Sequence, residues 1–286
     1  MDTIGTIVPP TKDLTGKSLD PNVVFFKIPQ DIGTLLCGYS NFYKDSPTKE
    51  KSAKSSFWNK LINFFTPAYN YHNYLVGTDG FAIYSCRNNT DNLKKVIEVK
   101  FKDTTDFFLM HKHYSKNFVY QYSEVFTTFY NRKTNKINWD QTETYHRKHT
   151  NESHIFNLVN CVEFAWTEYL MRSLSNDIEK YLFENGNLIF IIYNDRTKKL
   201  EEFVKLEVGK ITFLQGKNAP FTYHFNEIKK AYVKGGELFI EHTNYQKNFI
   251  FFSSGNKNAI PLGQLFNQKF FFRALSKLLG NIFSEE

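Results

Sequence analysis

The 286-residue sequence lacks any run of about 18 uncharged apolar residues, so it predicts no transmembrane helix. Its first residues, MDTIGTIVPPTKDLTGK, lack the basic segment followed by an apolar segment that marks a secretion signal. Its three cysteines, Cys37, Cys86 and Cys161, are far apart and form no CxxC pair, which favours reduced thiols over a disulfide scaffold or a zinc ribbon. These absences predict a cytoplasmic protein, with peripheral attachment to the inner face of the membrane left open.

Sequence motifs of common catalytic sites are missing too. The chain contains no GxSxG nucleophile motif, no GxGxxG loop and no GxxxxGK[ST] phosphate loop. No cysteine lies near a histidine in the sequence, and the glutamates form no recognisable acid–base pair. The sequence therefore gives no positive argument for an enzyme, and we assign no catalytic residue and no cofactor.

Positive charge is in excess, with a formal net charge of +7 and a pI of about 9.0. This balance is compatible with anionic partners such as nucleic acid or a lipid surface, but a lysine-rich solvated surface is the favoured explanation. The lysines are scattered, and no stretch is rich in arginine, the usual reader of bases and phosphates. Nucleic acid is therefore the less favoured partner.

Histidine forms the densest polar cluster. Five of the eight histidines lie within residues 111–154: His111, His113, His146, His149 and His154. On a strand, His111 and His113 share one face, as metal ligands require. Basic neighbours and the absence of an HExxH pattern favour exposed loop histidines. A metal site formed by His111, His113, His146 and His149 remains the alternative.

What the sequence does have is a high aromatic content of 17% and two similar halves. Residues 74–174 read as several strands, with turns at residues 78–80 and 115–117, followed by an amphipathic helix at 154–174. Residues 185–283 repeat this order, with turns at Gly209 and at Gly235–Gly236 and a final helix at 262–283. The spacing of about 110 residues predicts duplicated domains and not a solenoid.

This order of elements resembles the pleckstrin-homology-like (PH-like) fold, a small bent antiparallel barrel closed by one C-terminal helix. The closer likeness lies in VGKITFLQGKNAPFTYHFNEIKKAYVKGGELFIEH, which is similar to bacterial PH-like domains of unknown function. There, a motif like FNEI (residues 225–228) opens the next strand. The resemblance implies an α+β, mostly antiparallel β fold with two PH-like small barrels, at 74–174 and 185–283, each closed by a C-terminal helix.

Phosphoinositide-binding members of this fold place a lysine and arginine cluster, ending in arginine, between their first two strands. The corresponding loop here holds Arg87, Lys94 and Lys95 in the first copy, and only Lys210 and Lys217 in the second. This departure speaks against specific inositide binding. Arg87, Lys94 and Lys95 are retained as candidate contacts to a membrane or a partner.

Residues 1–73 read as an extended leader, a strand at 23–30, a short helix from Asp31, a mobile exposed loop at 45–56 and a second short helix at 57–65. The last segment, FWNKLINFF, is too short to be stable alone, so we expect it to dock on its own domain. The alternative is a membrane arm, in which lysines face anionic lipid and aromatic residues enter the headgroups. Its contact candidates are Lys49, Lys51, Lys54, Trp58, Lys60 and Phe65.

These observations together predict a non-enzymatic cytosolic binding or scaffold protein. Its expected partner is a protein or peptide, or an anionic membrane surface. Two other hypotheses remain, a metal-dependent hydrolase that uses the histidine cluster and a single-stranded nucleic-acid binder with basic and aromatic contacts.

Overall fold

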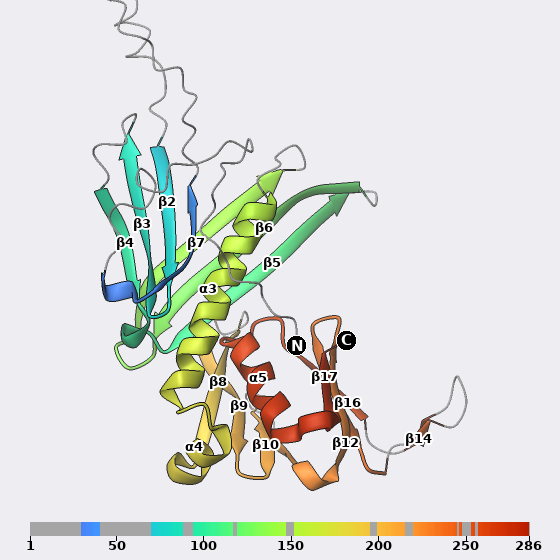
Figure 1. The fold of residues 1–286 in the computed structure, drawn as a ribbon. Coiled ribbons are helices and arrows are strands. Elements are labelled where there is room, and N and C mark those ends of the chain that lie inside the picture. The colour runs from blue at the N-terminus through green and yellow to red at the C-terminus, as the bar shows by residue number, and fades with distance from the viewer. Residues whose placement is uncertain are drawn as a thin grey trace, which may run out of the picture. The chain divides into compact units, whose positions relative to one another are not determined.

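The computed structural model describes residues 30–40, 70–87, 94–116, 119–146, 152–194, 199–214, 220–244, 246–247, 253–254 and 257–285. Within them, the predicted α+β class is confirmed: the sheets are mainly antiparallel and are accompanied by helices α3, α4 and α5 (Figure 1). The sheets formed by these residues are open, and none closes into a barrel. No helix in this part of the chain is long and apolar enough to cross a membrane.

The chain divides into two compact units. Unit 1 comprises Met1–Asp103 and Lys148–Trp166, and unit 2 comprises Thr104–Arg147 and Thr167–Glu286. Helix α3 (Glu152–Ser173) confirms the helix predicted at 154–174. Its residues up to Trp166 belong to unit 1, and those from Thr167 on belong to unit 2. The predicted domain limits at 74–174 and 185–283 stay a prediction.

Unit 1 contains an antiparallel sheet with the strand order β1-β2-β3-β4. The predicted turn after β2 is confirmed: it lies at Thr78 and Asp79, and the Asp79 amide donates to the Ile32 carbonyl over 2.8 Å. A Cβ atom at Gly77 would lie 2.1 Å from that carbonyl oxygen, so only glycine allows the close approach. The elements are η1 (Gln30–Ile32), β1 (Leu35–Ser40), β2 (Asn70–Gly77), β3 (Gly80–Arg87), β4 (Lys94–Lys100) and η3 (Phe101–Asp103).

The short helix predicted from Asp31 is wrong. Only a single 3-10 turn, η1, forms there, because Gly33 has a left-handed φ of 75° and ends it before β1. The side chains of Lys100 and Asp31 are 2.6 Å apart and connect η1 to the end of β4. This hydrogen bond to Asp31 raises the pKa of Lys100.

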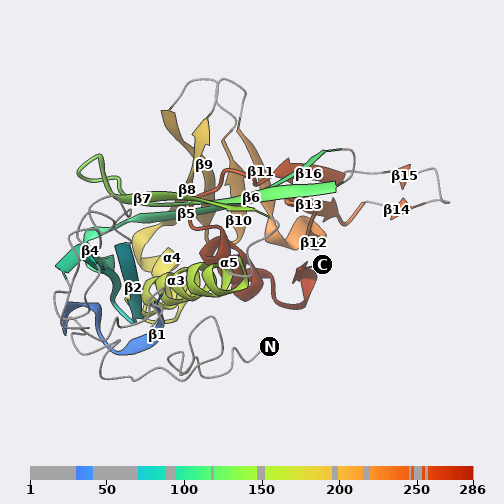
Figure 2. The same ribbon diagram turned by 90° about the horizontal axis from the view of Figure 1, so that it is seen from above.

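In unit 2, three long strands form a separate sheet with the order β5-β6-β7. They are β5 (Asp106–Lys116), β6 (Val119–Asn131) and β7 (Lys136–His146). The strands predicted on either side of residues 115–117 are confirmed as β5 and β6. The described part of residues 132–153 contains only one strand, β7, which pairs with β6. Figure 2 shows the three strands running alongside one another.

Two further sheets of unit 2 have the strand orders β11-β10-β9-β8 and β16-β13-β12-β17. The predicted turns are confirmed at Gly209, with φ 72°, and at Gly235 and Gly236, with φ 60° and 82°. The FNEI motif forms a 3-10 turn whose isoleucine begins β12, as predicted. The elements are β8 (Asn187–Asn194), β9 (Lys199–Glu207), β10 (Lys210–Phe213), β11 (Phe221–His224), η4 (Phe225–Glu227), β12 (Ile228–Lys234), β13 (Glu237–His242), β14 (Gln246–Lys247), β15 (Ser253–Ser254), β16 (Lys257–Pro261), η5 (Gly280–Ile282) and β17 (Phe283–Glu285).

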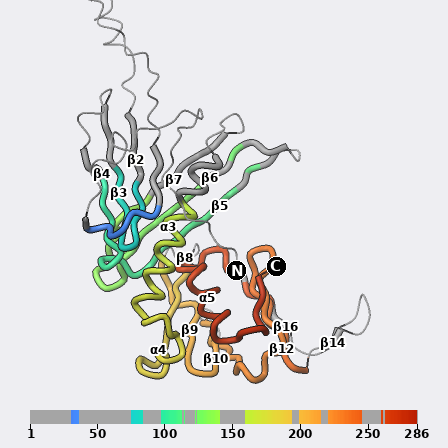
Figure 3. The backbone as a smooth tube through the Cα atoms, viewed as in Figure 1, coloured from blue at the N-terminus to red at the C-terminus, as the bar shows by residue number. Residues whose placement is uncertain are grey.

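The helix predicted at 262–283 is shorter than expected, because α5 spans only Gln268–Leu279. Asn267 precedes it in a left-handed conformation, with φ 55°, and Gly280 follows it with φ 55°. The chain then passes through η5 into β17, which pairs in parallel with β12 (Figure 3). Phe271 and Leu275 of α5 are buried in the main core of unit 2.

Helix α4 (Ile178–Asn185) was not predicted. Asp177 caps it by accepting a hydrogen bond from the Lys180 amide over 2.9 Å, and Gly186 ends it with φ 86°. The buried side chains of Ile178 and Leu182 join the core that contains α5.

Candidate functional site

Most of the residues predicted to touch a membrane or partner lie outside the described residues, together with the predicted loop at 45–56. They are Lys49, Lys51, Lys54, Trp58, Lys60 and Phe65, so the docking of FWNKLINFF and the membrane arm both stay predictions. Arg87 ends β3, and Lys94 and Lys95 begin β4, so their backbones flank the connection between these strands. Their side chains, like Lys217, are outside the described part of the structure. The Lys210 ammonium is 3.4 Å from the Glu207 carboxylate.

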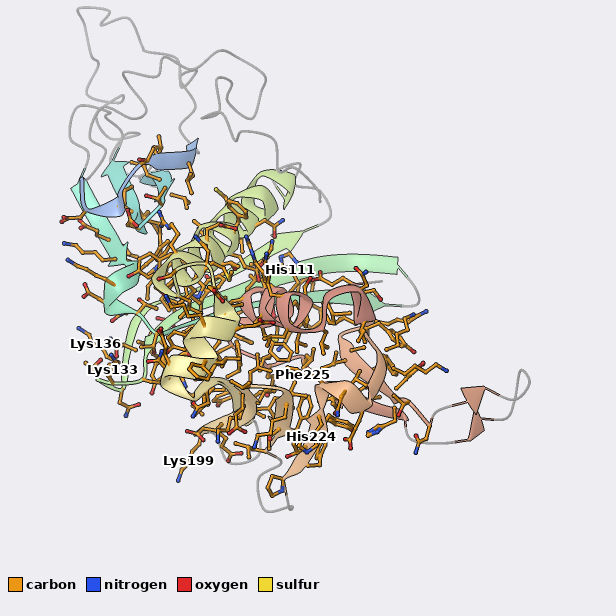
Figure 4. The ribbon with its side chains drawn as sticks, turned by 60° about the horizontal axis from the view of Figure 1, so that its bottom comes forward. His111, Lys133, Lys136, Lys199, His224 and Phe225 are labelled. Atoms are coloured by element: carbon orange, nitrogen blue, oxygen red, sulfur yellow. The ribbon has the colours of Figure 1, made fainter. Side chains whose placement is uncertain are left out.

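The predicted histidine cluster is only partly described. His111 is exposed on β5, His113 lies on the same strand and His146 ends β7 (His111 is labelled in Figure 4). The strand register pairs His113 with Ser123 and His146 with Tyr122. Among the described residues, no three His, Cys, Asp or Glu side chains gather as a metal site would require. Because His149 and the side chains of His113, His146 and His154 are not described, the metal site stays a prediction.

A buried polar network lies at the start of β5. The Asp106 carboxylate is fully buried and receives two hydrogen bonds from the Arg132 guanidinium, over 2.7 and 2.9 Å. It also accepts from the Thr105 hydroxyl over 2.6 Å and from the Asn267 side-chain amide over 3.1 Å. Arg132 in turn donates to the Ile189 carbonyl of β8 over 3.1 Å. The network therefore fixes β5, the β6–β7 turn, β8 and the segment before α5 to one another.

Asn267 pairs with β5 almost as a neighbouring strand would. Its backbone amide donates to the Phe107 carbonyl over 2.7 Å, and its side-chain oxygen accepts from the Phe107 amide over 2.8 Å. On the other side of the same segment, the Phe266 amide donates to the Ile191 carbonyl over 2.9 Å. The residues before α5 therefore bridge the edge of β5 and the edge of β8.

Beside this bridge, unit 2 contains an apolar pocket of about 520 Å³, which we call the hairpin pocket. Alternate residues of β5 and β6 form one wall: Phe108, Met110, Lys112, Phe126, Thr128 and Tyr130. The other walls are Ile137 of β7, Tyr193 of β8, Leu200 of β9, and Gln264 and Phe266 of the bridge. The Phe108 and Phe266 rings stack with centroids 4.9 Å apart.

One polar group within this wall has no partner. Thr128 is 7% exposed, and its buried hydroxyl makes no hydrogen bond to any described residue. A buried hydroxyl without a partner costs about 1–3 kcal/mol of stability. In the wall of a pocket, such a hydroxyl is available to bond to a ligand or to an ordered water molecule.

Replacing Thr128 with valine is expected to raise the free energy of unfolding by about 1 kcal/mol, because valine keeps the shape and removes the unpaired hydroxyl. Thr105→Val is the matched control, since the Thr105 hydroxyl donates to Asp106 and accepts from the Arg132 amide. That change should lower stability by about 1–3 kcal/mol. Urea denaturation measures both variants, and a loss of stability in Thr128→Val would contradict the interpretation.

The lining of the pocket includes one cation, Lys112. Lys112 is exposed and forms no ion pair with a described residue, although Glu124 lies opposite it in the strand register. Glu124 instead accepts from the Tyr114 hydroxyl over 2.9 Å, which raises the pKa of Tyr114. The Tyr114 and Tyr122 rings stack with centroids 4.3 Å apart beyond it. An apolar pocket, a lysine and an aromatic pair thus follow one another along β5 and β6.

A second apolar hollow, the α4 groove, lies elsewhere in unit 2. It is lined by residues that include Phe183 of α4 and Val208 of the β9–β10 turn, which are 83% and 60% exposed. Glu179 and Lys180 also line it. The α4 groove has large exposed apolar side chains but no unpartnered polar group among its described residues, so the hairpin pocket is the better candidate site.

No protein-family model matches this sequence, and no curated protein matches it. The candidate site therefore rests on its own geometry and chemistry.

Sequence reasoning missed every residue of the hairpin pocket. Its walls come from segments between Phe108 and Phe266, about 160 residues apart, and no local spacing connects them. The one available signal was the acidic Asp106 directly before the apolar run FFLM, since a carboxylate at the start of a buried strand needs a partner.

Proposed function

We propose that this protein is a non-enzymatic binding protein whose hairpin pocket takes up an apolar part of a peptide or protein partner. The observation that carries the proposal is the lining of the pocket, which is mainly aromatic and aliphatic with a few polar groups. Its volume lies within the range of about 300–1,000 Å³ that is usual for ligand sites. Ile137 is 55% exposed at the pocket, and covering a side chain of this type stabilises a complex by about 1.5–3 kcal/mol.

We also propose that the chain is a tandem pair of PH-like domains, each closed by its final helix. The order of described elements supports this: two antiparallel sheets and then a helix occur as β1–β4, β5–β7 and α3, although β1 (Leu35–Ser40) lies before the predicted domain start at residue 74. Two four-stranded sheets and a helix follow as β8–β11, then β12, β13, β16 and β17, with α5 before β17. Helix α4 and the β14–β15 pair have no described counterpart in the first set. For the cellular location we propose the cytoplasm, in line with the buried free thiol of Cys161.

Peptide display tests the proposed function. A random library selected on the wild-type chain is expected to enrich peptides with a bulky apolar residue. The same selection on Ile137→Asp, which places a charge at the pocket, should lose this enrichment. Val208→Asp is the matched control, because Val208 is exposed to a similar degree and lines the α4 groove instead. A wild-type selection without apolar enrichment would overturn the proposal.

A further inference from the structure

The outer edge of β5 has backbone partners at Phe107, and the described residues supply none at Leu109. In the described sheet β5 is an edge strand, and Asn267 takes both backbone groups of Phe107. Backbone groups on an edge strand point outward at every second residue, so Leu109 presents the next outward amide and carbonyl. Outside the β5–β6 pair, Leu109 makes no backbone hydrogen bond to a described residue.

We propose that the partner binds as an extended peptide segment that adds a strand to β5. This strand begins at Leu109, the next outward residue after Phe107, which pairs with Asn267. The inference rests on the proposed function and specifies how the hairpin pocket is used. Main-chain hydrogen bonds to Leu109 supply strand pairing, and the side chains of the peptide supply specificity. Asn267 already shows the geometry, because its amide and side-chain oxygen pair with Phe107 as a strand residue does.

The register of β5 sets which peptide side chains face the pocket. Residues directly opposite each other on neighbouring strands project to the same face, and this face alternates along the strand. Met110 and Lys112 both line the hairpin pocket and are two residues apart. A peptide residue opposite Met110 therefore enters the apolar pocket, and the residue two positions away lies opposite Lys112.

Lys112 determines the charge of that second residue. Its ammonium is exposed and without an ion pair among the described residues, so it favours an acidic side chain opposite it. The unpartnered hydroxyl of Thr128 favours an apolar anchor that also has a polar atom, as tyrosine does. The structure thus points to an extended peptide with a bulky apolar residue and an acidic residue separated by one position.

Two fluorescein-labelled peptides of equal composition, TTYTETT and TTYETTT, test this spacing by fluorescence anisotropy on the full chain. The first is expected to bind about three- to fivefold tighter, which is the upper range of an exposed ion pair. The wild-type chain should also bind TTYTETT more tightly than TTYTKTT, in which lysine replaces the glutamate. The variant Lys112→Glu should bind TTYTKTT more tightly than TTYTETT. Equal affinities for both peptides, or no detectable binding of either, would overturn the proposed mode.

Backbone methylation tests the strand pairing itself. In an added strand only alternate peptide amides face β5, so N-methyl groups at successive positions of TTYTETT should alternately weaken binding about tenfold and leave it unchanged. A uniform response overturns strand addition. If Ile137→Asp still abolishes binding in that case, the proposed function stands and only the strand-addition mode fails.

Discussion

Replacing Arg132 with alanine is expected to lower the free energy of unfolding by about 3–5 kcal/mol at pH 7, because it leaves a buried carboxylate without its partner. Asp106 is fully buried, whereas the Arg132 side chain is 35% exposed. The loss therefore falls on Asp106, which keeps only the hydrogen bonds from Thr105 and Asn267. Urea denaturation of the full chain, followed by circular dichroism, measures it.

The loss of unfolding free energy in Arg132→Ala should also depend on pH. Burial raises the pKa of Asp106 above its ordinary value, against the opposing effects of the Arg132 charge and the hydrogen bonds from Arg132 and Thr105. Folding therefore favours the protonated carboxyl, so the contribution of this group is complete below the unfolded pKa of about 3.9 and declines as the pH rises through the folded value. Without Arg132 the folded pKa moves further upward, and Arg132→Ala should be closer to wild type at pH 5 than at pH 8.

The double variant Asp106→Asn, Arg132→Ala is the control for this interpretation. It removes the buried charge together with its partner, so it should be more stable at pH 8 than Arg132→Ala alone. A double variant that is less stable than Arg132→Ala would show that the network acts through packing and not through charge.

Leu275→Asp is expected to unfold unit 2, because it places a carboxylate in the core. Leu275 is 1% exposed on α5 and belongs to the same core as Phe271 and Leu279. Truncation of such a leucine to alanine already costs about 2–5 kcal/mol, and an unpaired buried charge adds to this. Loss of the cooperative thermal transition of unit 2 in calorimetry measures the effect.

Ser276→Asp is the matched control for that change. Ser276 follows Leu275 on α5 but is exposed, so the same carboxylate remains in water there. The expected cost is within about 0.5 kcal/mol, as for most surface substitutions. Equal effects of the two substitutions would contradict the burial of this face of α5.

The parts of the fold that the sequence predicted depend on local signals. The turns at Gly209 and at Gly235–Gly236 have left-handed φ values that glycine adopts without strain, and the alternation on either side marks the strands. The helix predicted at 154–174 forms because its apolar residues repeat at helical spacing over about six turns. In each case, residues within about ten positions of one another determine the structure.

The corrections arise where a distant contact overrides a local pattern. The apolar spacing of residues 262–267 continues that of α5, but Asn267 adopts a left-handed conformation and bonds to Phe107, 160 residues away. Similarly, the segment after Asp31 forms β1 because it pairs with β2, across a stretch of about 30 residues. Neither partner is visible in the local sequence.

The candidate site could not be predicted for the same reason. The hairpin pocket combines β5, β6, β7, β8, β9 and the bridge before α5, and its polar network joins Asp106, Arg132 and Asn267. Sequence-based prediction favoured residues that are close together in the sequence, such as the five histidines at residues 111–154. The sequence does not show that the Thr128 hydroxyl is buried without a partner, because a segment such as FTTFY is compatible with any strand.

One affinity comparison tests whether the hairpin pocket binds the apolar part of a partner. A peptide selected on the wild-type chain is titrated against Ile137→Asp and Val208→Asp under identical conditions. Binding in the hairpin pocket predicts a loss of affinity of about tenfold or more for Ile137→Asp and a change of less than about twofold for Val208→Asp. The reverse order would place binding in the α4 groove and contradict the claim.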